Sequence, residues 1–329
     1  MELKVLITHI SYQAAGSFIK LLRKSLKYQF YILGCDSIPL GFSSGSMLVD
    51  EFYLSPNECD YKKYSSFITN LCKDKQINIV ISAEELDLLL FKKCNILQAF
   101  PQYIASHTIF ELFRDKYTAT IEIEKMGIQV PKTIMCLEEF SASQQKKFIQ
   151  RKRISCSSRG IKIFQKHEID KNYCFFHANY ITQEFIDGYS YTVDVFCDRQ
   201  GNLKLAIPRI SLSEKDGTTF KCVIKKNERI IALCREIYNA YNIPGFSNIQ
   251  FIEKNGIPYF IELNPRAAAT MIAASLVSVN WLDLYIDNFV YGINLDSAEE
   301  MMKQVCWNSV ISRYYEETIL YGEQGDNVH

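Results

Sequence analysis

Three side chains with oxygen donors flank one short turn in the last third of the sequence. Gln250 precedes the Lys-Asn-Gly turn at residues 254–256, and Glu262 and Asn264 follow it. Residues two apart on a strand project from one face, and a residue across a hairpin can share that face. Carboxylate and amide oxygens suit Mg²⁺, which takes its other ligands from water and substrate phosphates. The spacing predicts a metal site, and the alternative is a surface hairpin with a polar face.

Cationic groups suited to phosphate occur at two places. Residues 151–160 read Arg-Lys-Arg-Ile-Ser-Cys-Ser-Ser-Arg-Gly, a basic segment that runs into small residues. Small residues let backbone N–H groups approach phosphate oxygens, and basic side chains supply countercharge. Arg266, just past the second oxygen-donor strand, could brace a phosphoryl group during transfer. Residues 151–160 therefore predict a phosphate-binding loop, with an exposed basic loop as the alternative.

A third feature is the segment Gln-Glu-Phe-Ile-Asp-Gly at residues 183–188, where a strand pattern runs into a turn. Such a strand can offer a backbone donor and acceptor to the edge of a purine, and Glu184 could meet an exocyclic amine. The alternative is an ordinary junction between a strand and a turn.

Other kinds of chemistry lack their motifs. The histidines show no metal-like spacing, and no G-x-S-x-G motif occurs, so we interpret the histidines as structural or surface residues. The turn after the first strand pattern, residues 9–16, lacks G-x-G-x-x-G, which disfavours a nicotinamide enzyme.

Composition limits the class of protein. The 329 residues are 48% hydrophobic and 22% charged, and 37 basic residues balance 37 acidic ones. A globular chain without a net field is not expected to bind nucleic acid or a membrane surface. Eleven cysteines without a C-x-x-C pair, and a start without a signal-peptide layout, predict a cytoplasmic protein. The apolar run at 267–282 is too short to span a bilayer comfortably and predicts a buried helix.

The elements that must position these residues fall into two parts. The first third alternates strand patterns with helical patterns at 18–26 and 64–73, which predicts a parallel sheet. From about residue 105 a helix at 114–126 and a later helix at 227–241 accompany strand patterns that pair across turns. The strand patterns of the first part are 3–8, 30–33 and 77–81, and those of the second are 147–151, 160–164, 180–185, 191–197, 203–208, 248–253 and 258–263.

Taken in order, these features resemble the ATP-grasp superfamily, in particular the single-chain carboxylate-amine ligase branch similar to the synthetase unit of the carbamoyl phosphate synthetase large subunit. The likeness covers about residues 1–290, and its motifs lie at residues 82–87, 114–133, 151–160, 183–186 and 262–266. The resemblance implies an α/β and α+β fold, with an open parallel α/β (pre-ATP-grasp) unit followed by a two-lobed ATP-grasp domain with antiparallel sheets. The implied domains are 1–105, 106–182 for the lobe with the phosphate loop, 183–295 for the lobe with the metal site, and a tail at 296–329.

The resemblance also implies roles for individual residues. Lys116 contacts the phosphates of ATP, and the metal residues bind one or two Mg²⁺ ions, with Mn²⁺ as an alternative. Arg266 assists the transferred phosphoryl group. The implied nucleotide-binding residues are Lys116, Arg151, Lys152, Ser158, Gln183, Glu184, Phe185, Ile186 and Ser190, and Arg209, Lys221 and Asn248 are implied to line the site.

The sequence departs from the family pattern at three places. In the phosphate loop, Arg151 stands where the family has lysine and Lys152 where it has proline, and serines replace glycines. Ser190 takes the place of a frequent ribose-binding glutamate. Residues 267–270 read Ala-Ala-Ala-Thr where the family often has glycine or serine.

The implied activity is a Mg-dependent ligase that uses ATP to phosphorylate a carboxylate and couples the acyl phosphate to an amine. An amino acid is the expected substrate, and a homodimer is expected from the apolar C-terminal third. The alternative is an ATP-binding regulatory or partner protein with little turnover. The presence of Gln250, Glu262, Asn264 and Arg266 favours the enzyme.

Overall fold

The structure is a computed structural model in which residues 2–82, 84, 87, 88, 91, 100, 105–154, 160–169, 173–215, 218–314 and 316–321 are described. The chain forms two compact units. The first comprises Met1–Tyr103, Ala269–Leu295 and Arg313–His329, and the second comprises Ile104–Ala268 and Asp296–Ser312. Residues 155–159 of the predicted phosphate loop, Ser158 among them, lie outside the described residues, as does half of the motif at 82–87.

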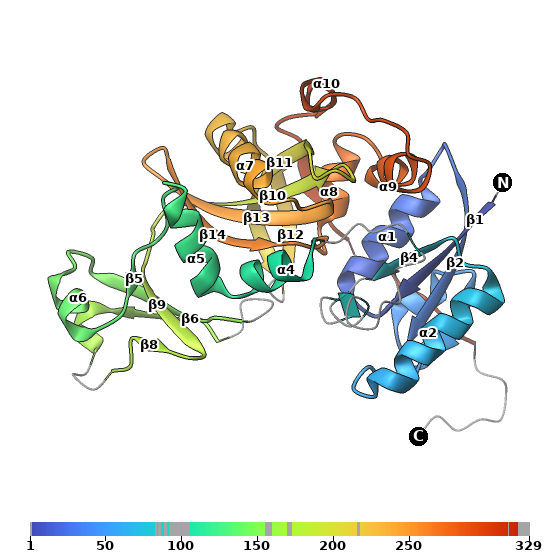
Figure 1. Cartoon of the computed structure of the whole chain (residues 1–329), viewed down its shortest axis with the longest axis horizontal. Helices are drawn as coiled ribbons and strands as arrows, with labels where there is room; N and C mark the ends of the chain where they lie inside the picture. Colours follow the sequence, from blue (N-terminus) through green and yellow to red (C-terminus); the bar gives the residue numbers. More distant parts are fainter. Residues whose placement is uncertain are drawn as a thin grey trace. The chain divides into compact units, whose positions relative to one another are not determined.

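A parallel sheet of four strands forms the centre of the first unit (Figure 1). Three of its four strands are mostly apolar and buried, as expected for a sheet that is covered on both faces, whereas the edge strand β3 has no buried residue. The spatial order is β3-β2-β1-β4, so the connection from β3 to β4 crosses to the other side of β1. The strands are β1 (Glu2–Thr8), β2 (Gln29–Asp36), β3 (Glu51–Leu54) and β4 (Ile79–Ser82).

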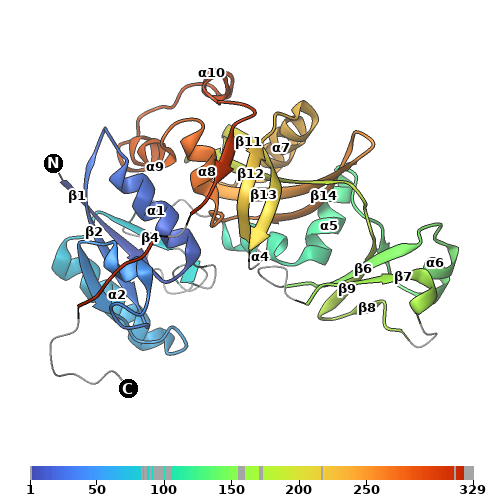
Figure 2. The same ribbon diagram turned by 180° about the vertical axis from the view of Figure 1, so that it is seen from behind.

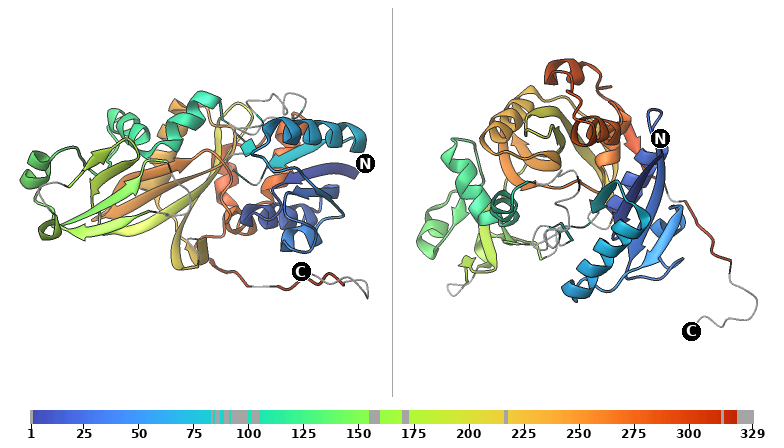
Figure 3. Two further views of the ribbon diagram at one scale, coloured as in Figure 1. Left: turned by 90° about the horizontal axis from the view of Figure 1, so that it is seen from below. Right: turned by 45° about the vertical axis from the view of Figure 1, so that its right-hand side comes forward.

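Helices lie on both faces of this parallel sheet. Because β1 to β2 and β3 to β4 run in opposite directions across the sheet, right-handed connections place α1 (Gln13–Arg23) and α2 (Tyr61–Lys75) on opposite faces (Figure 3). The Asp60 carboxylate caps α2 by accepting a hydrogen bond from the Lys63 N–H. Two later helices, α8 (Met271–Leu276) and α9 (Trp281–Tyr285), pack against α1.

The single helix predicted at 267–282 was wrong, because the segment forms α8 and the start of α9 with a break between them. The Ser275 hydroxyl donates to the Val279 carbonyl and accepts from the Trp281 N–H, and Asn280 caps α9. These side-chain hydrogen bonds compete with helical ones and end α8. The segment is nonetheless buried, as Trp281 and its apolar neighbours show.

A six-stranded antiparallel sheet, here called the large sheet, dominates the second unit. Its order is β14-β13-β10-β11-β12-β15, and β15 lies beside β12 at one edge (Figure 2). At the hairpin between β13 and β14, Asn255 and Gly256 both have positive φ, as the predicted Asn-Gly turn requires. The strands are β10 (Tyr189–Cys197), β11 (Leu203–Lys215), β12 (Thr218–Ile224), β13 (Gly245–Lys254), β14 (Ile257–Asn264) and β15 (Val310–Ser312).

One face of the large sheet is apolar and forms a core with three helices. Val193, Ile249 and Leu263 lie in this core together with side chains of α4 (His107–Arg114), α5 (Lys116–Lys125) and α7 (Glu228–Ala240). Strand alternation consequently turns the residues between them to the opposite, polar face.

The helix predicted at 114–126 was also wrong in its start. Residue 114 ends α4, and α5 begins at Lys116, because Asp115 between them is extended and caps α5.

A smaller antiparallel sheet, here called the small sheet, completes the second unit. It has the order β5-β9-β6-β7, with β8 paired to β9, and one face packs on α6 (Leu137–Ala142) through Phe140 and Phe148. The strands are β5 (Thr133–Ile134), β6 (Lys147–Lys152), β7 (Lys162–Gln165), β8 (Phe176–His177) and β9 (Tyr180–Glu184). The remaining short elements are Ser44–Met47, Lys166–Glu168, Ile286–Val290 and α10 (Ala298–Lys303).

The predicted fold class is confirmed, since a parallel α/β unit is joined to antiparallel sheets. The sequence patterns missed the short strands β3, β5, β8 and β15, and also β12. The division into four domains stays a prediction. The boundary between the two units, at residues 103 and 104, lies close to the first predicted domain boundary at residue 105. Residues 269–295, which were predicted to belong to the lobe with the metal site, are part of the first unit.

Candidate functional site

The predicted metal residues lie together on the polar face of the large sheet. Gln250 on β13 is directly opposite Glu262 on β14, and Asn248 is opposite Asn264. Directly opposite residues share a face, and Glu262 and Asn264 are two apart on one strand. The Asn264 amide nitrogen donates to Glu262 Oε1 at 3.1 Å and to Asn248 Oδ1 at 3.2 Å. The structure thus brings the two strands' oxygen donors into one patch.

Glu262 is the charged centre of this patch, and two cations lie near it. Lys116, at the first position of α5, places Nζ 3.5 Å from Glu262 Oε2, and its side chain is 9% exposed. Burial raises the pKa of Glu262, but the charges of Lys116 and Arg151 and the hydrogen bond from Asn264 outweigh it, so the pKa lies below its usual range. Glu262 is therefore an ionised carboxylate at neutral pH.

Arg151, buried on β6 of the small sheet, contributes to the lowered pKa of Glu262. Its Nη2 donates to Gln183 Oε1 at 2.5 Å, while its buried Nε has no hydrogen-bond partner in the described part of the chain. An unpartnered N–H of a buried guanidinium is costly, so the group is poised to accept an anionic ligand. Lys152 is exposed and alternates to the other face of β6.

The Gln183 side chain is fully used within the protein. Besides accepting from Arg151, it donates to the Pro131 carbonyl and to Thr133 Oγ1, each at 3.2 Å. Gln183 therefore positions Arg151, and the sequence pattern, which favoured a nucleotide contact, gave no sign of this pairing across strands.

The predicted adenine-binding segment leaves the small sheet directly after β9. The Glu184 N–H donates to the Lys132 carbonyl and the Phe185 N–H to the Lys147 carbonyl. No hydrogen bond within the described residues uses the Ile186 N–H. Glu184 alternates to the face opposite Gln183 and Arg151, and Ser143 Oγ donates to its carboxylate. On the Arg151 face, backbone groups and not the Glu184 carboxylate are available to a purine.

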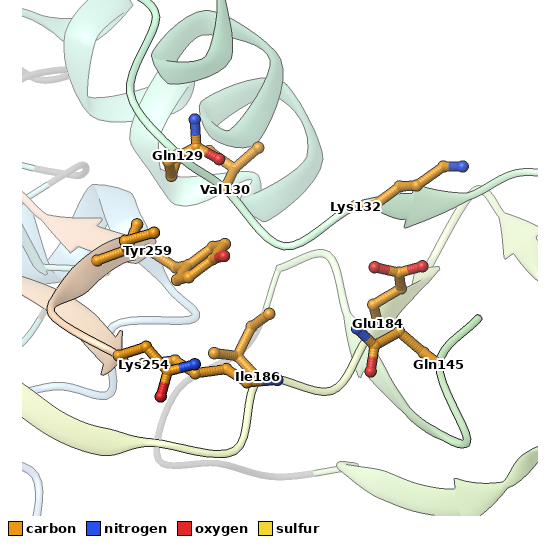
Figure 4. Close-up of a pocket in the computed structure, with 10 residues that line it drawn as sticks. Gln129, Val130, Lys132, Gln145, Glu184, Ile186, Lys254 and Tyr259 are labelled. Carbon is orange, nitrogen blue, oxygen red and sulfur yellow. The ribbon is translucent and has the colours of Figure 1, made fainter. Parts of the chain in front are cut away.

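A pocket of about 320 Å³ opens beside this segment (Figure 4). Glu184 and Ile186 line it from the small sheet side, and Lys254 and Tyr259 line it from the hairpin of β13 and β14. Gln129 and Val130 close it from the segment that follows α5.

The remaining predicted residues surround the patch to different degrees. Arg266 follows β14, contributes to the lowered pKa of Glu262, and accepts a hydrogen bond at its carbonyl from Asn248 Nδ2. Arg209 is buried on β11 and paired with Asp194 at 2.9 Å, a partner that the sequence pattern missed. Lys221 is exposed on β12, and Ser190 is exposed on β10, opposite Ile252. Neither has a described contact with Glu262.

The donor set fits a hard divalent cation that keeps most of its ligands from outside the protein. In the described part of the chain, no three His, Cys, Asp or Glu side chains are grouped to hold a metal ion. A single carboxylate with amide oxygens suits Mg²⁺ when phosphates and water supply the other ligands. The Asn264 amide turns its nitrogen to Glu262, so shared coordination requires that this amide rotate to present its oxygen. None of the described helices is long and apolar enough to cross a membrane.

Comparisons with known proteins agree with this arrangement. Residues 113–270 match the model of the ATP-grasp domain. Over 102 residues, 31% of this chain, the sequence is 34% identical to the carbamoyl phosphate synthase large chain of Sulfolobus acidocaldarius and 33% identical to that of Sulfurisphaera tokodaii. The aligned part spans 9% of the length of these relatives.

Three solved structures share the fold at low sequence identity. An L-amino acid ligase from Bacillus licheniformis has a TM-score of 0.65 and 14% identity, covering 94% of this chain and 78% of that one. Biotin carboxylase from Campylobacter jejuni has a TM-score of 0.69 and 14% identity, covering 91% and 73%. The biotin carboxylase domain of the Hydrogenobacter thermophilus 2-oxoglutarate carboxylase, solved with MgADP and bicarbonate, has a TM-score of 0.67 and 15% identity, covering 93% and 73%. Residues 113–270 are thus an ATP-grasp domain, and the chain is homologous to the carbamoyl phosphate synthase large chain over the part that aligns.

Proposed function

We propose that this protein is an ADP-forming ligase that phosphorylates a carboxylate with Mg-ATP and couples the acyl phosphate to an amine. The observation that carries the proposal is the ion pair of buried Lys116 with Glu262, whose negative charge is also stabilised by buried Arg151 from another element. When a metal ion binds Glu262, the two buried cations near this carboxylate can pair with phosphate groups instead.

Glu262 and Asn264, with Gln250 across the hairpin, would hold Mg²⁺. The ion would neutralise charge on the phosphates and orient them for in-line transfer. The biotin carboxylase domain with MgADP supports this assignment by its fold.

The chain's own residues supply positioning and charge. Lys116 and Arg151 bind the phosphates, and Arg266 faces the transferred group, where negative charge is spread in the transition state. The Ile186 N–H donates to the adenine edge, and the carbonyl of Glu184 accepts from its amino group. Arg209, Lys221 and Asn248 are proposed to line the acceptor side, and Lys152, Ser158, Phe185 and Ser190 to complete the nucleotide site.

A carboxylate and an amine are the proposed substrates, because attack of a carboxylate on the terminal phosphate gives an acyl phosphate from which an amine displaces phosphate. The resemblance favours an amino acid as one of them. A cytoplasmic location and a homodimer stay predictions.

The test is release of ADP and phosphate from Mg-ATP by the purified protein, screened against pools of amino acids and small carboxylic acids. Release should depend on an added acid and should fall by about 100-fold or more in Glu262→Gln, which keeps the shape of the side chain and removes its charge. Glu122→Gln on the surface of α5 is the matched control and should retain full activity. Full activity in Glu262→Gln would refute the metal assignment.

The test also separates the enzyme from a regulatory protein. Tight binding of ATP without release in the presence of any pool would identify a nucleotide-binding protein with little turnover. The serines that replace glycines in the phosphate loop, and Ser190 in place of a ribose-binding glutamate, are the sequence features that favour this alternative.

A further inference from the structure

One ion pair ties together the two segments that carry the phosphate-binding cations. Arg153, just after β6, places Nε 3.0 Å from Asp115 Oδ1 and 3.1 Å from Oδ2, and its Nη2 also donates to Oδ2. Two nitrogens of one guanidinium thus engage both oxygens of one carboxylate, the geometry that makes an arginine pair directional. Lys116 follows Asp115 in the chain, and Arg151 precedes Arg153 by two residues.

A second hydrogen bond, from the start of α5, holds the Asp115 carboxylate in place. Its Oδ1 accepts a hydrogen bond from the Tyr117 N–H at 3.0 Å and so caps α5. The residue between Asp115 and Tyr117 is also held, because the Lys116 N–H donates to the Arg153 carbonyl at 3.0 Å. The backbone of Lys116 is therefore held by the end of the small sheet as well as by its own helix.

Aromatic rings hold the guanidinium in place. The Arg153 guanidinium carbon lies 5.1 Å from the ring centre of Tyr117 and 5.8 Å from that of Phe176 on β8. The two rings contact each other edge to face. Cation–π contacts on two rings, added to the paired carboxylate, leave the guanidinium little rotational freedom.

We propose that Asp115 and Arg153 are positioning residues for nucleotide binding, because they fix the distance between Lys116 on α5 and Arg151 on β6. This inference rests on the proposed nucleotide site. Neither residue contacts Glu262 in the described structure, so each acts through its neighbour in the chain. The Arg153 side chain is 21% exposed and that of Asp115 15%.

A simple surface salt bridge is the competing explanation, and it makes a different prediction. If the pair only stabilised the fold, its loss would lower the melting temperature and leave the affinity of the folded protein for ATP unchanged. A positioning pair alters affinity for Mg-ATP while the melting temperature stays nearly constant.

The experiment is calorimetric titration of the full-length protein with Mg-ATP. Asp115→Asn keeps an oxygen that can cap α5 and removes only the charge, and Arg153→Gln removes the guanidinium. Each should weaken Mg-ATP binding by about tenfold, and the double variant should bind no more weakly than either single one. Arg153→Lys keeps the charge without the fork and should restore only part of the affinity.

Two controls make the result specific. Arg23→Gln breaks a more exposed ion pair with Asp50 in the first unit and should leave Mg-ATP binding unchanged. In a Lys116→Ala background, Asp115→Asn should have little further effect, because the influence of Asp115 passes through Lys116.

The outcomes distinguish a failure of the positioning role from a failure of the proposed nucleotide site. Wild-type protein that binds Mg-ATP, with unchanged affinity in both single variants, overturns the positioning role alone. Wild-type protein that does not bind Mg-ATP overturns the nucleotide site and this inference with it. A variant that melts like wild type but binds weakly supports the proposal.

Discussion

At the scale of single residues, His9 illustrates how much one side chain depends on its partners. It follows β1, has a φ of 51°, and lies beside Asp87, with Nδ1 3.2 Å from Oδ2. Burial lowers the pKa of His9, but hydrogen bonding to Asp87 and the charges of Asp87, Glu58 and Glu84 raise it to about 9. His9 is an imidazolium at neutral pH and forms an ion pair with Asp87.

This shift predicts a pH dependence of stability. Because the pKa of folded His9 lies above its ordinary value of 6.5, its contribution is complete below pH 6.5 and is lost as the pH rises through about 9. The loss should be on the order of 3 kcal/mol in the free energy of unfolding. Urea unfolding across this range measures it.

His9→Gln should remove that dependence on pH, whereas His167→Gln, at an exposed position, should keep it. Equal pH dependence in wild type and His9→Gln would contradict the assignment.

Only some residues of the candidate site could be predicted from the sequence. Gln250, Glu262 and Asn264 follow from strand alternation across an Asn-Gly turn, because both signals are local. Gln183 with Arg151, and Asp115 with Arg153, pair residues more than 30 positions apart. Nothing in local spacing encodes such pairs, since they depend on how separate strands and helices pack.

At the scale of elements, two glycines test helix geometry in opposite directions. Gly127 follows α5 with a φ of 79°, whereas Gly16 lies within α1. At both positions an added Cβ would have no neighbouring atom within 4 Å outside the adjacent backbone. Gly127→Ala should destabilise the protein by about 1 kcal/mol, because the left-handed conformation is strained for alanine.

Gly16→Ala should stabilise the protein by roughly 0.5–1 kcal/mol, because alanine loses less conformational entropy in a helix. Denaturant unfolding compares the two variants directly. A shift of the same sign in both would show that space and not backbone conformation decides the effect.

Elements were predicted well where the pattern was long and poorly where side chains intervened. The three parallel strands predicted in the first unit, β1, β2 and β4, are apolar runs typical of a sheet that is covered on both faces. The break after Leu276, in contrast, depends on hydroxyl and amide groups whose partners lie several residues away. The short strand β15 pairs with β12 across a large separation in sequence, which no local pattern could indicate.

At the scale of the whole molecule, the proposed site predicts coupling between ligand and stability. A ligand that binds only the folded state, at about 100 times its Kd, raises the free energy of unfolding by about 2.7 kcal/mol. Mg-ATP should have this effect on the unfolding of the second unit, as followed by calorimetry.

Removal of Mg²⁺ with EDTA should reduce that stabilisation, and Glu262→Ala should abolish the part that depends on the metal. Equal stabilisation by ATP with and without Mg²⁺ would argue against a shared metal and nucleotide site.

The first unit is assembled from three separate stretches of the chain, and this has a consequence for synthesis on the ribosome. Most of the second unit lies in the single stretch 104–268, whereas α1 must wait for α8 and α9, which are translated more than 240 residues later. Until then the part of α1 that α8 and α9 cover has no partner from its own chain. A nascent chain halted before residue 271 should therefore be a good client for chaperones, and fragments that end near residue 105 should be prone to aggregate.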